Sequence, residues 1–307
     1  MLRPSSLPRI AKCISSYAES AGMPSIGSDA AALGTAWHRV AASLVVWGRD
    51  AAERECSRAA VELLVSADQL REWLTDFDFI PTERAIYYPE YKLTGKFGDV
   101  KISGTADLVT VFHGGLLEIT DYKSGLAEYS DEETWTQLDA YAVMAARTFG
   151  ATRCRTTLHY ARLGAGGWAH RDIDVEETRA RLTDIVTKAI EHTELPKNAR
   201  IYRTGSHCTF CPGRIGCQAY TADITAFGAL MATGASPIVT AENALPFWER
   251  AGQVAKLADA ARDAVKALVR SSGGELASGG KKLRLAMEHR KEYVVKAGER
   301  EVMRVVK

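Results

Sequence analysis

Apolar residues recur at helical spacing over residues 30–75, and the pattern then becomes that of strands. The runs DAAALGTAWHRVAASLVVWG and SRAAVELLVSADQLREWL have apolar positions three and four residues apart, which indicates amphipathic helices. From about residue 83, RAIYYPEYKL, DVKISGTADLVTVFH and GLLEITDYK are rich in β-branched and aromatic residues. The turn residues His113, Gly114 and Gly115 predict a hairpin between the second and third of these strands.

Helical spacing returns at residues 131–150 and 175–195, with two strand-like runs, TRCRTTLHYARL and GWAHRDIDV, between them. This order predicts an α/β or α+β core with a mixed sheet flanked by helices. Residues 244–270 predict a further helix, followed by a Gly/Ser break, SSGGELASGGKK. We therefore expect a core domain at 1–220 and a helical accessory region with a basic tail at 221–307.

Composition and charge exclude few classes of protein. No apolar run approaches the roughly 20 residues of a membrane-spanning helix, and the start MLRPSSLPRI lacks a signal-peptide core, so a cytoplasmic protein is expected. The net charge of +1 gives no global basic field, although a protein that binds nucleic acid in one groove needs basic groups there only. The stretch 281–307 has nine Lys or Arg and four Glu.

Two aspartates and a lysine form the first candidate site. Asp121 and Lys123 lie two apart on one predicted strand, so their side chains share a face. Asp107 and Asp121 each lie seven residues from Gly114, and the hairpin should therefore place them opposite each other. Paired carboxylates favour a hard divalent cation, and an adjacent lysine can orient water or neutralise a phosphate. Taken alone, D-x-K is short and frequent, and an exposed, salt-bridged strand end is the better interpretation.

The motifs G-T-A-D (104–107), I-T-D-Y-K-S-G (119–125) and Q-L-D-A-Y (137–141) together resemble the RecB-type branch of the PD-(D/E)XK nuclease superfamily. The resemblance implies a restriction-endonuclease-like fold in which Asp107, Asp121 and the Tyr122 backbone carbonyl bind Mg²⁺ or Mn²⁺. It makes Lys123 the catalytic lysine and gives Gln137 and Tyr141, on one helical face, positioning roles.

Two further residues follow from the same resemblance. His38, in the G-x-x-x-H setting of Gly34–His38, is expected to contact the metal, although a lone helical histidine is more often structural. Glu83, on the first strand-like run, takes the place where related nucleases often have an acid.

Cysteines form the second candidate site. Cys208, Cys211 and Cys217 have the spacing C-x₂-C-x₅-C, which suits one soft metal centre that needs a fourth ligand. The adjacent His207 would complete a zinc site. Cys56 and Cys154 are expected to be small buried side chains.

The resemblance favours Cys13 as the fourth ligand, because iron–sulfur RecB-like nucleases have one cysteine before the catalytic motifs and three after them. These include the AddB nuclease subunit and the CRISPR-associated exonucleases. A 4Fe-4S cluster on Cys13, Cys208, Cys211 and Cys217 would join the ends of the core as a staple.

No P-loop motif is present, so the sequence predicts a stand-alone nuclease without its own motor. The resemblance implies an exonuclease acting on single-stranded DNA or end-bearing duplex, in recombination, repair, or phage or CRISPR DNA processing. A helicase or a recombination or CRISPR protein is a candidate partner, and an oligomer is compatible with the sequence. Beyond residue 220 the layout resembles that of phage proteins in the superfamily. The competing class is a non-catalytic iron–sulfur or zinc module that binds single-stranded DNA or protein.

Overall fold

The structure, a computed structural model, describes residues 2–23, 29–124, 132–232, 240, 244–273, 275–278 and 281–284. Its α-helices are α1 Leu7–Lys12, α2 Ser16–Glu19, α3 Asp29–Trp47, α4 Arg49–Leu63, α5 Ala67–Asp76, α6 Glu132–Phe149, α7 Val175–Glu194, α8 Gln218–Ala232 and α9 Ala244–Ser271. Its strands are β1 Ala85–Phe97, β2 Val100–Phe112, β3 Leu116–Lys123, β4 Arg153–Tyr160, β5 Trp168–Ile173, β6 Glu275–Ser278 and β7 Lys281–Arg284. Short 3₁₀ turns are η1 Pro4–Ser6, η2 Ala161–Gly166, η3 Lys197–Ala199, η4 Ser206–Phe210 and η5 Pro212–Gly216.

The chain forms two compact units, each described by itself. The first, the nuclease unit, comprises Met1–Arg203 and Phe210–Cys217, and the second comprises Thr204–Thr209 and Gln218–Lys307.

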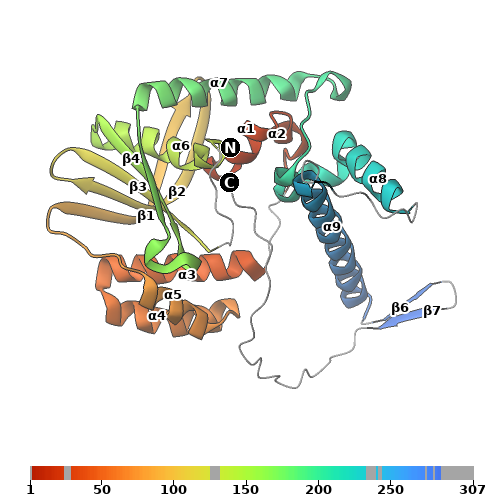
Figure 1. The fold of residues 1–307 in the computed structure, drawn as a ribbon, viewed down its shortest axis with the longest axis horizontal. Helices are drawn as coiled ribbons and strands as arrows, with labels where there is room; N and C mark the ends of the chain where they lie inside the picture. Colours follow the sequence, from red (N-terminus) through yellow and green to blue (C-terminus); the bar gives the residue numbers. More distant parts are fainter. Residues whose placement is uncertain are drawn as a thin grey trace. The chain divides into compact units, whose positions relative to one another are not determined.

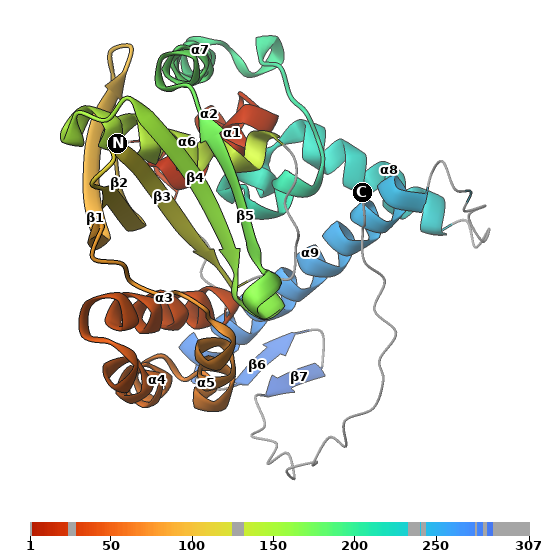
Figure 2. The ribbon, with the colours of Figure 1, turned by 60° about the vertical axis from the view of Figure 1, so that its left-hand side comes forward.

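The nuclease unit is built on a five-stranded sheet in the order β1-β2-β3-β4-β5. The pair β3–β4 is parallel and the other neighbours are antiparallel. Helix α6 makes the crossover that a parallel pair requires. Figures 1 and 2 show α3, α4 and α5 grouped on the side of the sheet away from α7. This mixed sheet between helical layers confirms the predicted α/β fold class.

Two large apolar clusters hold these layers together, and a small third one around Leu138 and Leu158 lies between α6 and β4. The larger joins the sheet to α1, α6 and α7, and it includes Leu7, Ile102, Val109, Ile119 and Leu182. The smaller joins α3, α4 and α5 to the sheet around Trp37, whose ring lies edge-on to those of Trp73 and Phe77. Each cluster buries the apolar stripe of its amphipathic helices, which is the main source of their stability.

The second predicted helical run is two helices rather than one. Helix α4 ends at Leu63 because Leu64 takes a left-handed conformation with φ of 55°. Helix α5 then begins with Ser66 as its N-cap, whose side chain accepts a hydrogen bond from the Gln69 N–H at 3.2 Å. The apolar periodicity continued through this break, which is why the sequence pattern did not reveal it.

The second unit comprises helices α8 and α9 and the antiparallel hairpin β6–β7. The predicted Gly/Ser break contains strand β6, so part of it is regular structure. The predicted basic tail lies outside the described residues from 285 onward. Among the described helices, none is both long enough and apolar enough to span a membrane.

Candidate functional site

Asp107 and Asp121 come together where β2 and β3 pair. Leu108 is opposite Thr120 in this antiparallel ladder, so the next pair in register is Asp107 and Asp121. The Tyr122 N–H donates a hydrogen bond to Asp107 Oδ2 at 2.8 Å. The hairpin geometry deduced from the turn at Gly114 therefore places both carboxylates as the sequence predicted.

Glu90 adds a third carboxylate at the same level of the sheet. Pro89 pairs with Leu108 and Tyr91 with Ala106, so Glu90 lies opposite Asp107 on the neighbouring strand. Ligand atoms of His38, Glu90 and Asp107 all lie within 4.8 Å of one another, which is close enough to hold one metal ion. Two adjacent strands and α3 thus contribute one ligand each to this cluster, and Asp121 follows in register on the third strand.

Sequence analysis missed Glu90 and named Glu83 instead. Glu83 is exposed in the turn before β1. Glu90 has a positive φ of 49°, which is rare for a residue other than glycine, asparagine or aspartate. The available signal was Pro89, since a proline inside a strand marks an edge strand or a local irregularity.

His38 projects from α3 toward the acids. Its Nε2 donates a hydrogen bond to the Tyr122 carbonyl oxygen at 2.8 Å, and its Nδ1 lies 3.4 Å from Asp107 Oδ1. Neighbouring ligands of an octahedral Mg²⁺ lie roughly 3.0 Å apart, as follows from bond lengths near 2.1 Å. At 2.8 Å the imidazole and the carbonyl oxygen form a hydrogen-bonded pair, and both could bind one cation once the Nε2 proton is lost.

Lys123 and Gln137 hold the buried carboxylate of Asp121 from two sides. Lys123 Nζ lies 2.6 Å from Asp121 Oδ2, and Gln137 Nε2 donates to Asp121 Oδ1 at 2.9 Å. The side chain of Asp121 is 5% exposed and that of Lys123 is 27% exposed. The amine therefore contacts a fixed acid and still reaches solvent, as a group that meets substrate must.

Tyr141 lies one helical turn after Gln137 and is buried. A β-carbon at Gly104 would lie 2.7 Å from Tyr141 Oη and 2.9 Å from Pro4 Cδ, so this position has no room for a side chain. Burial, with the nearby charges of Asp107 and Asp121, raises the pKa of Tyr141, and the phenol stays neutral. In this geometry its ring packs against Gly104.

Without a bound cation, burial and mutual repulsion disfavour the ionised form of these carboxylates. Burial, followed by the charge of Asp121, raises the pKa of Asp107 to about 7, while His38, the Tyr122 N–H and Lys123 oppose the shift. Partial desolvation also raises the pKa of Glu90. A divalent cation would allow these carboxylates to be ionised together, so the donor set of imidazole, carboxylates and carbonyl fits Mg²⁺ or Mn²⁺.

The cysteine segment packs against the start of the chain. Cys13 follows α1, and Cys211 and Cys217 flank η5 in the same unit. Burial raises the pKa of Cys211, Arg9 opposes this, and the nearby thiols of Cys13 and Cys217 raise it further. Their sulfur atoms do not form a group as tight as that of His38, Glu90 and Asp107. Thiols from both ends of the nuclease unit nevertheless converge.

Polar contacts join the same two ends. Ser15 Oγ donates to the Ile201 carbonyl at 2.6 Å, and Glu19 accepts hydrogen bonds from Arg200 and Tyr202, each at 2.8 Å. Gly213 packs directly on Glu19, since a β-carbon there would lie 2.2 Å from the Glu19 carbonyl oxygen. The chain ends are therefore held together independently of any cluster.

Cys208 belongs to the second unit. It is buried, and its Sγ lies 3.9 Å from His207 Nε2. The first cysteine of the C-x₂-C-x₅-C motif thus lies beside His207, the alternative zinc ligand.

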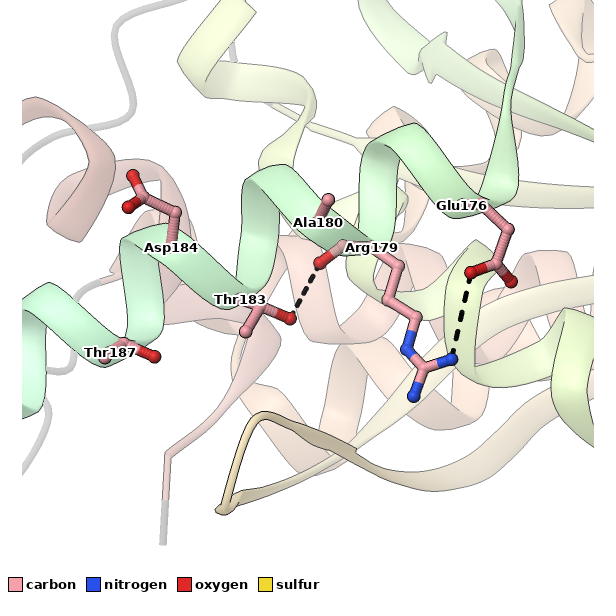
Figure 3. A pocket seen from close by; sticks show the side chains of 6 residues that line it. All are labelled: Glu176, Arg179, Ala180, Thr183, Asp184 and Thr187. Atoms are coloured by element: carbon pink, nitrogen blue, oxygen red, sulfur yellow. Dashed lines mark hydrogen bonds and ion pairs between the residues drawn. The ribbon is translucent and has the colours of Figure 1, made fainter.

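An open depression of about 520 Å³ on α7 is separate from both candidate sites. It is lined by Glu176, Arg179, Ala180, Thr183, Asp184 and Thr187. Figure 3 shows that the polar contacts here stay within the helix: Thr183 Oγ1 donates to the Arg179 carbonyl at 2.8 Å, and Arg179 faces Glu176 at 3.9 Å. Both contacts join residues of α7 to each other, and we assign no function to this depression.

A mixed five-stranded sheet flanked by helices, with acids level on adjacent strands, is a restriction-endonuclease-like α/β fold. The family model for the PD-(D/E)XK nuclease superfamily matches residues 4–218, and the chain belongs to this superfamily. Membership indicates a nuclease that uses a divalent metal.

Comparison with other proteins adds little to this assignment. No curated protein matches the sequence. The solved structure titled "Crystal structure of SSO0001" matches at 15% sequence identity and a TM-score of 0.34, covering 61% of this chain and 85% of that chain. A similarity this weak carries no argument about fold or function.

Proposed function

We propose that the protein is a divalent-metal-dependent deoxyribonuclease that shortens DNA from its ends. The observation that carries the proposal is the convergence of His38, Glu90 and Asp107 beside Asp121 and its lysine partner. This set provides both a cation site and a cationic side chain that reaches solvent, and both can assist phosphodiester hydrolysis. The preference for ends rests on the resemblance of residues 5–220 to iron–sulfur RecB-like exonucleases.

Each residue has a role that follows from its contacts. His38, Glu90, Asp107, Asp121 and the Tyr122 carbonyl hold Mg²⁺ or Mn²⁺, which supplies Lewis-acid polarisation of the scissile phosphate and activation of water. Lys123, fixed by Asp121 and open to solvent, orients the attacking water and neutralises charge that develops on the phosphate. Gln137 fixes the orientation of Asp121, and Tyr141 packs against Gly104, three residues before Asp107.

A matched pair of variants tests this proposal. Lys123→Ala should lower Mn²⁺-dependent cleavage of end-labelled DNA by at least about 100-fold, as expected when a group that acts in the transition state is lost. Glu83→Gln removes an exposed acid outside the cluster and should cleave like the parent. Equal activity of Lys123→Ala and parent would disprove the catalytic assignment.

Circular and linear single strands of the same sequence test the preference for ends. An exonuclease degrades the linear strand and spares the circle, whereas comparable loss of both would disprove the proposed requirement for an end. Tight DNA binding by the parent without cleavage of either substrate would favour the alternative of a non-catalytic binding module.

We also propose that Cys13, Cys208, Cys211 and Cys217 hold a 4Fe-4S cluster. Support comes from the convergence of Cys13, Cys211 and Cys217 and from the C-x₂-C-x₅-C spacing. The cluster would add to the contact between Glu19 and Arg200, which already joins the two ends of this unit. Anaerobically purified protein should be brown and contain about four iron atoms per chain. Colourless protein with one zinc would instead favour the site completed by His207.

On resemblance, the biological setting is recombination, repair, or phage or CRISPR DNA processing, with a helicase as a candidate partner. Co-purification of the full chain with a helicase that stimulates its cleavage would support that setting. Unchanged cleavage in the presence of such a helicase would argue against it.

A further inference from the structure

The exposed face of the two strands β1 and β2 carries a row of lysines. Residues 91–97 and 100–106, here called the ribbon, continue past β3, whose pairing with β2 covers only Leu108–Val111. Alternation places Tyr91, Leu93 and Phe97 in the apolar core on one face. The other face presents the exposed side chains of Lys92, Thr94, Lys96, Lys101 and Thr105.

Two of these lysines oppose each other directly. Lys96 pairs with Lys101 in the ladder, and like charges in that position destabilise a sheet. Within the described part of the chain, Lys92, Lys96 and Lys101 make no ion pair or hydrogen bond. Such a repulsion between like charges lowers stability, and when no other contact offsets it, it is typical of a functional surface.

Protection of a sheet edge explains only part of the pattern. Lysines on an edge strand discourage edge-to-edge association, and β1 is an edge strand. Lys101 is on β2, which has β1 on one side and the backbone of Leu2 on the other. The charge of Lys101 therefore has no part in blocking an open edge.

The lysine row leads to the metal site. Glu90 directly precedes the ribbon on β1, and Asp107 directly follows it on β2. Lys92 and Lys96 are four residues apart, or about 14 Å along the strand, a length of several nucleotides. The opposite face of the ribbon is packed on α6, where Gly95 meets Met144, so the lysines stand on a rigid base.

We propose that this face of the ribbon binds the phosphate backbone of the DNA strand that enters the active site. Exposed lysines without acidic partners, spaced along one line that ends at the acids, complement a polyanion. Exposed aromatic rings are missing from positions 92, 94, 96, 101, 103 and 105, so the contact is with phosphates and independent of sequence. The proposal deepens the nuclease function above and rests on it.

A DNA-binding measurement without metal distinguishes the ribbon proposal from the nuclease proposal. The full-length double variant Lys96→Gln/Lys101→Gln is compared with parent and with Lys188→Gln/Arg153→Gln, which removes the same charge elsewhere on the nuclease unit. Fluorescein-labelled 20-nucleotide DNA is titrated by anisotropy in EDTA at several salt concentrations. Mn²⁺-dependent cleavage and thermal unfolding are measured on the same samples.

The ribbon variant should bind about tenfold more weakly, and its slope of log affinity against log salt should fall by about 1.5, since each phosphate contact contributes about 0.7–0.9. Its melting temperature should equal or exceed that of the parent, because the opposed charges are gone. The control should bind like the parent.

Two other outcomes overturn different proposals. A parent that binds and cleaves DNA, beside a ribbon variant with the affinity and salt slope of the control, would overturn the ribbon proposal alone. A parent that neither binds nor cleaves DNA would overturn the nuclease proposal and the ribbon proposal with it.

Discussion

The hydroxyl of Tyr141 occupies the space that a β-carbon would need at Gly104. The separation would be 2.7 Å to Oη and 3.1 Å to Cε1, well inside van der Waals contact. The glycine of the G-x-x-D motif and the tyrosine of the Q-x-x-x-Y motif are therefore two halves of one packing contact. The side chain that position 104 can hold therefore depends on the residue at position 141, nearly 40 positions later in the sequence.

Gly104→Ala should destabilise the protein by about 1–3 kcal/mol, the usual cost of overpacking. Because the closest clash is with the hydroxyl oxygen, the same substitution should cost less in a Tyr141→Phe background. Urea unfolding of the four proteins in this double-mutant cycle measures the coupling. Gly114→Ala is the control, since a β-carbon there meets nothing within 4 Å. Equal costs in both backgrounds would contradict the packing argument.

Glu90→Gly and Glu90→Gln should both weaken Mn²⁺ binding, because each removes a carboxylate of the cluster. The glycine variant should be more stable than the glutamine variant by about 1 kcal/mol, since only glutamine keeps a side chain at positive φ. Calorimetric Mn²⁺ titration and thermal unfolding give the two quantities. Undiminished Mn²⁺ affinity in both variants would remove Glu90 from the site.

Metal-free protein should lose stability as pH rises from about 4 to about 7. In this window folded Asp107, with its pKa raised to about 7, retains a proton that the unfolded chain has released, so higher pH favours unfolding. Asp107→Asn abolishes this dependence and should be more stable than metal-free parent at pH 8, by on the order of 1–3 kcal/mol.

Added Mn²⁺ provides the converse test. It should stabilise the parent at pH 8 and leave Asp107→Asn nearly unchanged, because the variant lacks a charged ligand. Parallel pH profiles for parent and variant without metal would refute the assigned shift.

Gln137→Ala should lower the turnover rate about 10- to 100-fold while the protein stays folded, since its amide orients Asp121. Gln137→Glu would place a second acid against Asp121 and should be worse. Steady-state kinetics at saturating Mn²⁺ measure the effect. Arg147→Ala, an exposed change on the same helix, should match the parent.

Cys211→Ser should abolish visible absorption and lower the melting temperature, because one cluster ligand is lost. Cys154→Ser is matched in chemistry and also buried, and it should keep the absorption. Spectra and thermal unfolding of anaerobic samples check both. Identical spectra for Cys211→Ser and parent would exclude Cys211 as a ligand.

Alternation and turn chemistry were sufficient to predict much of the sheet. The hairpin at 113–115 and the opposition of Asp107 and Asp121 follow from counting residues about a turn. The helix at 131–150 was equally clear, because its apolar positions keep one period. The grouping of His38 with the acids came from resemblance, since no local pattern connects α3 with β3.

Glu90 could not be found in the same way. Ala106 and Val109 belong to one apolar cluster although they are three residues apart, and so do Tyr88 and Tyr91. Strict alternation would send each pair to opposite faces. The strands change face at Glu90 and Asp107, and this change depends on tertiary packing and a positive φ that propensity does not encode.

The contact between Ser15 and Ile201 joins residues 186 positions apart. During synthesis at about 5–20 residues per second, the N-terminal segment must wait roughly 10–40 s for the residues it packs against. Throughout that interval Leu7 and Ile10, buried in the finished protein, lack part of their cover. We therefore expect ribosome-associated chaperones to raise the folding yield of the newly made chain without changing the stability of the folded protein.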